Sequence, residues 1–165
     1  SKLKEKKHLP LVWMLSYTLP GIPSIYYGSE FGIEGRKEGG NDDPLRPAVD
    51  LENLKNQNEK KELTQWIKQL GQIKAENKEL SFGKYRELLL TNRQYAFARV
   101  MDQNAVIIAV NNDEKEADLW IPIPVGANQY RDVVTNEEMP LENGKIHIQL
   151  PAFGSKIWRL VRDEK

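Results

Sequence analysis

The chain has 165 residues, 39% of them hydrophobic and 29% charged, and its 24 basic side chains balance its 24 acidic ones. This composition is typical of a globular protein, and the zero net charge gives no general attraction to nucleic acid or to anionic membranes. The absence of cysteine excludes disulfides, thiolate catalysis and cysteine-based zinc sites. No run of about eighteen apolar residues occurs, so no transmembrane helix is expected. Without a signal-peptide pattern the compartment stays open, with the cytoplasm slightly favoured.

The first third of the chain has the pattern of an α/β protein. Apolar spacing predicts a helix over residues 3–18, which the Pro20-Gly21 pair ends. The run Ile22–Tyr27 is apolar on both faces, as in a buried strand of a parallel sheet. A polar, Gly- and Pro-rich segment from Phe31 to Leu54 predicts a long loop, and helical spacing returns over residues 59–76.

From Leu80 onward the hydrophobic period changes from that of a helix to that of a strand. Ile146, Ile148 and Leu150, for example, alternate with polar neighbours. Short β-rich segments separated by turn signals predict an antiparallel sandwich or barrel, with the boundary near residues 77–82. The expected strands are Lys84–Leu90, Gln94–Met101, Ala105–Asn111, Ala117–Ile123, Gln129–Val134, Lys145–Leu150 and Lys156–Val161.

The most informative stretch is Gly21-Ile22-Pro23-Ser24-Ile25-Tyr26-Tyr27-Gly28-Ser29-Glu30. Gly21 permits a turn with positive φ, Pro23 stiffens the entry to the strand, and Gly28 ends it. Glu30 then carries a charge that needs a partner. The alternative to a functional role is that Glu30 pairs with a nearby arginine and only braces the loop.

This stretch resembles the strand-eight signature of the α-amylase family of glycoside hydrolases, Gly-x-Pro-x-x-x-Tyr-Gly-x-Glu. The fixed positions correspond to Gly21, Pro23, Tyr27, Gly28 and Glu30. The similarity is greatest to maltogenic amylases, neopullulanases, cyclomaltodextrinases and oligo-glucosidases. In that family an antiparallel sandwich, domain C, follows a (β/α)₈ barrel. The resemblance therefore implies an α+β chain, in which residues 1–79 are the end of a barrel and residues 80–165 are domain C.

The family commonly has an Asp and an Arg after this strand that hold a glucose unit of the substrate. The matching stretch here is Gly40-Asn41-Asp42-Asp43-Pro44-Leu45-Arg46-Pro47, which is shorter than the commoner form. The resemblance leaves the acidic position open between Asp42 and Asp43 and points to Arg46 as the base. A carboxylate accepts hydrogen bonds from sugar hydroxyls, and a guanidinium donates them in a fixed fork. The alternative is an ordinary solvated turn.

The resemblance also implies that this segment lacks the catalytic groups. Retaining glycosidases need two carboxyl groups about 5–5.5 Å apart. The family places its nucleophilic Asp after strand four, its acid/base Glu after strand five and a His-Asp pair after strand seven. Neither His8 nor His147 precedes an Asp. We therefore expect no catalytic residue here: the parent enzyme hydrolyses α-glucosidic bonds, and this chain alone is inactive.

No cofactor or metal is expected, because the two histidines are far apart in the sequence and Asn111-Asn112-Asp113 suits a hairpin turn better than a calcium site. Since His147 alternates with apolar neighbours, it is expected to face outward. Trp13, Trp66 and Trp158 are expected in the core, whereas Trp120 is a candidate for exposure.

The expected partners are an α-glucan or maltooligosaccharide, bound through the parent enzyme, and the rest of the barrel, with no nucleic acid and no membrane. Because Ile22–Tyr27 lacks barrel neighbours in this sequence, we expect residues 1–58 to be rearranged, packed onto the sandwich or paired with another chain, including a second copy. Two alternatives are an α-glucan-binding sandwich, favoured if Trp120 and Tyr130 are exposed together, and a structural or interaction domain.

Overall fold

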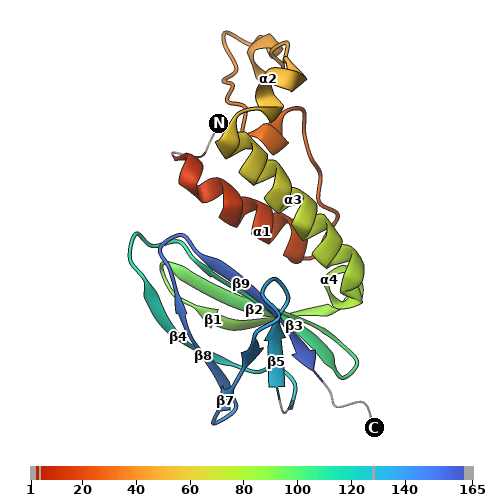
Figure 1. Cartoon of the computed structure of the whole chain (residues 1–165), viewed down its shortest axis with the longest axis vertical. Helices are drawn as coiled ribbons and strands as arrows, with labels where there is room; N and C mark the ends of the chain where they lie inside the picture. The colour runs from red at the N-terminus through yellow and green to blue at the C-terminus, as the bar shows by residue number, and fades with distance from the viewer. Residues whose placement is uncertain (1–2, 4, 128, 162–165) are drawn as a thin grey trace.

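The computed structural model describes residue 3, residues 5–127 and residues 129–161 of the chain. The described residues form three layers: a layer of helices, a six-stranded sheet beneath it and a three-stranded sheet on the far side (Figure 1). The two sheets make the sandwich that the sequence predicts. In this part of the chain, no helix combines the length and apolar character needed to cross a membrane.

Both sheets are antiparallel, as the alternating pattern predicts. All the expected strands form, with ends shifted by two residues at most; the two-residue strands β6 and β7 were not predicted. The six-stranded sheet has the order β1-β2-β3-β9-β5-β6, and the three-stranded sheet has the order β4-β8-β7. The bounds are β1 Lys84–Leu90, β2 Gln94–Met101, β3 Asn104–Asn111, β4 Ala117–Pro122, β5 Gln129–Asp132, β6 Glu138–Met139, β7 Leu141–Glu142, β8 Lys145–Leu150 and β9 Ser155–Val161.

The centre of the six-stranded sheet is buried on both faces, since β3 is buried from Ala105 to Asn111, whereas the edge strand β1 is largely exposed. Toward the helices, β-strand residues such as Phe97 and Ile108 join one core cluster with α1 and α3. Toward the three-stranded sheet, Ile107 and Trp158 join a second cluster. Alternating side chains of one sheet therefore hold the helical layer on one face and the second sheet on the other.

The helical layer agrees with the sequence prediction only in part. The helix expected over residues 3–18 begins later: a 3₁₀ turn at Lys6–His8 precedes α1, where Pro10 suits the first turn. Residue 4 lies outside the described residues. The helix expected over residues 59–76 is confirmed as α3, whereas α2 and α4 were not predicted. The helices are α1 Leu9–Thr18, α2 Leu51–Lys55, α3 Asn58–Glu76 and α4 Lys78–Phe82, with further 3₁₀ turns at Ser29–Phe31 and Asp43–Leu45.

The expectation of a buried strand at Ile22–Tyr27 is wrong for this structure. The segment has no regular strand, Ile22 is 95% exposed, and Ile25, Tyr26 and Tyr27 are exposed as well. Among the described residues no strand runs beside it, and an extended segment without a partner gains neither ladder hydrogen bonds nor burial. Three outcomes were expected for residues 1–58. One of them, packing onto the sandwich, is seen for α1, whereas the segment Ile22–Tyr27 remains exposed to solvent.

Two cations bind carbonyl oxygens at helix ends: Arg99, which is buried, joins the helices to the sandwich, and Lys74, which is half-buried, joins helices to one another. Arg99 on β2, 2% exposed, donates hydrogen bonds to the carbonyl oxygens of Thr18 (2.9 Å) and Gly83 (2.9 and 3.2 Å). Lys74 on α3 donates to the carbonyl oxygens of Tyr17 (3.1 Å) and Leu80 (3.0 Å). Burial lowers the pKa of both side chains, and the charge of Arg99 further lowers the pKa of Lys74. The donors satisfy carbonyls at the ends of α1 and α4 that have no partner within their helices.

Candidate functional site

The turn that follows the exposed segment is built around Gly28. Gly28 is buried with φ of +72°, and its carbonyl accepts hydrogen bonds from the backbone of Phe31 and Ile33. A Cβ at this position would meet the Ile33 side chain at 2.5 Å. Both the left-handed backbone and the close packing therefore require glycine here. The turn leads into the 3₁₀ segment Ser29–Phe31, which lies against α3.

Glu30 is half-buried in this turn. Its backbone carbonyl accepts a hydrogen bond from the Thr64 hydroxyl of α3 at 3.1 Å. Its Oε2 atom is buried, and none of the described residues donates a hydrogen bond to it. The bracing arginine considered from the sequence is thus not found among the described residues. A buried carboxylate oxygen without a donor is costly, so a donor from outside these residues would stabilise the turn.

Two adjacent tyrosines hold the following loop. Tyr26 accepts a hydrogen bond at 2.7 Å from Nε of Arg46, and Tyr27 donates one at 2.9 Å to the carbonyl of Pro47. Tyr27 is the tyrosine of the signature, and Tyr26 precedes it. The exposed segment therefore sets the position of the loop end, although residues 21–23 of the signature lie exposed or half-exposed upstream of this contact.

The three candidate sugar-contacting residues are exposed and do not form one ion-paired cluster. Asp42 pairs with Lys37 at 3.0 Å. Asp43 opens the 3₁₀ turn, and its backbone N–H donates to Asn41 Oδ1 at 2.9 Å. Arg46 is oriented by Tyr26, and in the described part of the chain neither aspartate carboxylate pairs with it. Among the residues that the structure describes, only Nε of this guanidinium has a hydrogen-bond partner, which leaves its terminal N–H groups for another acceptor.

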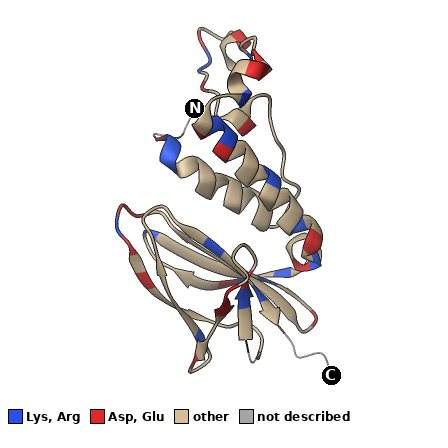
Figure 2. Cartoon of the chain, viewed as in Figure 1, with Lys and Arg blue, Asp and Glu red and all other residues tan. Residues whose placement is uncertain are grey.

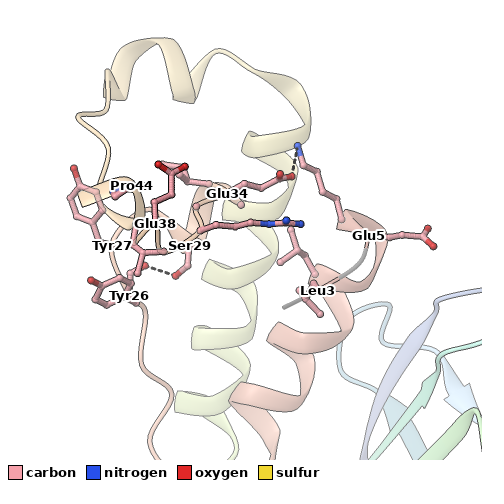
Figure 3. A pocket seen from close by; sticks show the side chains of 15 residues that line it. Leu3, Glu5, Tyr26, Tyr27, Ser29, Glu34, Glu38 and Pro44 are labelled. Atoms are coloured by element: carbon pink, nitrogen blue, oxygen red, sulfur yellow. Dashed lines mark hydrogen bonds and ion pairs between the residues drawn. The ribbon is translucent and has the colours of Figure 1, made fainter. Parts of the chain in front are cut away.

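A cleft of about 840 Å³ lies next to this loop and was not predicted. Figure 3 shows Tyr26, Tyr27 and Pro44 on one side and Leu3 and Glu5 on the other. An ion pair of 3.3 Å joins Glu34 to Lys6 across the opening. Asp42, Asp43 and Arg46 do not line the cleft. No sequence signal pointed to it, because it forms between the start of α1 and a loop about thirty residues later.

Three of the four tryptophans lie as expected, whereas Trp66 lies at the edge of the core. Trp13 and Trp158 are buried, Trp66 is half-buried and donates to the carbonyl of Pro10 at 3.2 Å, and Trp120 is exposed. His147 stacks on Trp120 on the outside of the sandwich, so its outward orientation is confirmed.

Tyr130, in contrast, is fully buried, so the joint exposure of Trp120 and Tyr130 that would favour an α-glucan-binding sandwich is not found. Its hydroxyl donates inward to the carbonyl of Val125 at 3.3 Å. Within the residues that the structure describes, no group of three His, Asp or Glu side chains is arranged to hold a metal ion.

The amino-acid sequence of the sandwich matches a known family. Residues 85–157, from β1 to β9, match the model of the maltogenic amylase C-terminal domain. The chain contains a C-terminal domain of the α-amylase family. The family resemblance inferred from the strand-eight signature is therefore confirmed, and the match covers the sandwich rather than the signature itself.

This amylase C-terminal domain and its helices are similar to parts of much longer proteins. The chain is 27% identical over 141 residues to a cyclomaltodextrinase of Thermoanaerobacter pseudethanolicus, covering 86% of the chain and 23% of that protein. It is 28% identical over 157 residues to neopullulanase 2 of Thermoactinomyces vulgaris, covering 93% of the chain and 25% of that protein. The solved structure of AmyP in complex with maltose shares the fold with a TM-score of 0.79 at 21% identity, covering 96% of this chain and 36% of that one. The chain thus spans about a quarter of the length of these curated relatives.

Proposed function

We propose that this chain is the C-terminal portion of an enzyme that hydrolyses α-glucosidic bonds in α-glucans. Residues 1–79 supply the last strand and helices of its barrel, and residues 80–165 are the stabilising amylase C-terminal domain. The names of the curated relatives and the strand-eight signature support this function. The catalytic carboxylates belong to other parts of the enzyme, so this chain alone is inactive.

One observation carries the proposal. α1 and α3 pack on the sandwich through a shared core, yet the segment between them leaves Ile22, Ile25, Tyr26 and Tyr27 exposed, with no strand of the described residues beside it. Next to it lies the buried Oε2 of Glu30, which lacks a donor among the described residues. Apolar side chains and an unpaired carboxylate in one segment fit a surface that neighbouring barrel strands would cover.

The loop that follows would contribute to sugar binding in the assembled enzyme. The Tyr26 hydroxyl accepts from Nε of Arg46 and so holds this side chain in place. The remaining N–H groups of Arg46 would then donate to sugar hydroxyls. Asp42 or Asp43 would accept hydrogen bonds from the same glucose unit, provided that Asp42 exchanges its Lys37 partner for the sugar.

Association with a barrel tests this function. We would truncate the T. pseudethanolicus cyclomaltodextrinase before the region that this chain matches, mix it with the chain, and measure complex formation by ultracentrifugation together with cyclomaltodextrin hydrolysis. The wild-type chain should bind and restore activity. The double variant I22K/I25K should do neither, because two charges on the apolar segment oppose burial.

The matched control is Val134→Lys, which places a charge at an exposed position on the sandwich and should behave as the wild type. Binding that is insensitive to I22K/I25K, or no binding by the wild-type chain, would contradict the proposal. Hydrolysis of maltoheptaose by the chain alone would show that the catalytic groups are present in it.

Two alternatives use the same chain differently. The exposed segment Ile22–Tyr27 would also suit self-association, which ultracentrifugation of the chain alone would reveal as a dimer lost in I22K/I25K. A purely structural or interaction domain would bind neither the truncated barrel nor any sugar.

A further inference from the structure

The outer face of the three-stranded sheet carries one aromatic side chain in a polar setting. Along β4, Leu119 and Ile121 point into the sandwich core, whereas Asp118 and Trp120 point outward. Trp120 is 43% exposed. Packing does not require an indole at this position, because its strand neighbours already fill the core.

The indole is held in a fixed orientation. Trp120 lies opposite His147 on β8, and their rings stack with centroids 4.1 Å apart and planes 5° apart. His147 is in turn held by Asp118, whose Oδ1 lies 2.5 Å from Nε2 of the imidazole. A ring that is already fixed loses little conformational entropy when a ligand stacks on it.

The surroundings fit a neutral saccharide better than other ligands. The neighbouring outward residues on β8 are Lys145 and Gln149, opposite Pro122 and Asp118, so the indole is not part of a large apolar patch of the kind that binds proteins. Asp118 and Lys145 carry opposite charges, and both basic and acidic residues occur along the strands of the sandwich (Figure 2), so this face offers no basic track for nucleic acid. A sugar ring has an apolar C–H face that matches the indole, and hydroxyls that match carboxylate, amide and ammonium groups.

We propose that Trp120, with Asp118 and His147, forms a saccharide-binding platform on the sandwich for a glucose unit of an α-1,4-linked glucan. The platform lies on the far side of the six-stranded sheet from the helices and from the loop that contains Arg46 (Figure 1). The identity of the glucan rests on the proposed function, whereas the platform itself rests on the geometry of β4 and β8. A polymer held here would stay at high local concentration near the rest of the enzyme.

An amide- and indole-resolved NMR titration of the chain with maltoheptaose tests the platform. The Trp120 indole N–H and the amides of β4 and β8 should shift saturably. Trp120→Ala should weaken this binding at least about tenfold, since it removes the stacking surface. Phe82→Ala is the matched control, because it removes an exposed ring on α4 at the opposite layer and should leave the affinity unchanged.

Trp120→Phe is a second variant for the case in which Trp120→Ala disturbs the fold. Because it keeps an aromatic ring on the strand, it should weaken maltoheptaose binding less than Trp120→Ala does. No shift at Trp120, or binding unchanged in both Trp120 variants, would overturn the platform. An equal response to cellohexaose would overturn the assignment to α-glucan. None of these outcomes depends on the barrel-binding experiment, so a failure of the platform and a failure of the proposed function remain distinguishable.

Discussion

The guanidinium of Arg99 on β2 donates a hydrogen bond of 2.9 Å to the carbonyl of Thr18, the last residue of α1. The same side chain binds the carbonyl of Gly83, where α4 ends. Among the described residues no carboxylate pairs with Arg99, so its buried charge is stabilised by backbone carbonyls alone. One side chain of the sandwich thus completes the ends of two helices.

Arg99→Ala should lower the free energy of unfolding by about 2–4 kcal/mol, because it leaves the carbonyls of Thr18 and Gly83 buried without donors. Urea unfolding followed by circular dichroism measures the change. Arg86→Ala is the control, since Arg86 also donates to a carbonyl but is exposed. A loss no larger than that of the control would show that the junction does not depend on Arg99.

The lowered pKa of Lys74 predicts a pH dependence of stability. Burial, assisted by Arg99, lowers its pKa in the folded state below the ordinary 10.5. Between these two values the unfolded chain binds more protons than the folded one, so this side chain makes stability rise as pH increases toward 10.5. Lys74→Met should lose this contribution, so the stability difference between wild type and variant should grow with pH over that window.

Urea unfolding of both proteins at a series of alkaline pH values measures this difference. Other titrating groups, including Tyr95, whose pKa is raised by burial and by its bond to Tyr85, cancel in the comparison. Lys68→Met, at an exposed position of α3, should show a constant difference across the series. A constant difference for Lys74→Met as well would contradict the prediction.

Substitutions in the exposed segment should leave the stability of the chain alone unchanged. Ile22→Lys should alter the free energy of unfolding by less than about 0.5 kcal/mol, because Ile22 contacts little in this structure. Met14→Ala in the fully buried face of α1 should cost about 2–5 kcal/mol. A large loss in the Ile22 variant, measured by the same urea unfolding, would mean that the segment is packed in solution.

Glu30→Gln should stabilise the chain alone by about 0.5–1 kcal/mol, since it replaces a buried, unpaired carboxylate oxygen by a neutral group of the same shape. Glu34→Gln, on an exposed ion pair, is the control and should change stability by less than about 0.5 kcal/mol. The sign should reverse for Glu30 once a barrel supplies its donor. Destabilisation of the chain alone by more than 1 kcal/mol would reveal a partner that is already present.

The strands were predictable because their hydrophobic pattern agrees with their environment. On β2, the alternate residues Tyr95, Phe97 and Arg99 face the helices. The small residues between them face the second sheet. The two-residue strands β6 and β7 were missed because they are too short to show a period. Helix α2 was missed because its signal is a single cap, the Asp50 side chain that accepts from the backbone of Glu52 and Asn53.

The error at Ile22–Tyr27 has a different origin. An apolar run predicts burial, but the strand that buries it must come from elsewhere, and its formation depends on that partner. The cleft beside Tyr26 and the role of Arg99 at the junction were also not predictable, because each joins segments far apart in the sequence. The exposure of Trp120 could be predicted as one possibility, because the alternating pattern places its neighbours Leu119 and Ile121 in the core.

The centre of the six-stranded sheet is covered on both faces, by the helices and by the second sheet. Removing α1 and α3 would uncover Phe97, Ile108 and Ile157, which are fully buried against them. A segment that begins at residue 80 would therefore expose this apolar surface to water and be prone to aggregation, so it would not fold as an independent domain. In chimeras of related enzymes, the two helices and the sandwich would have to be transferred together. The crossover point for such chimeras therefore lies upstream of α1, and not where the sequence changes from helical to strand periodicity.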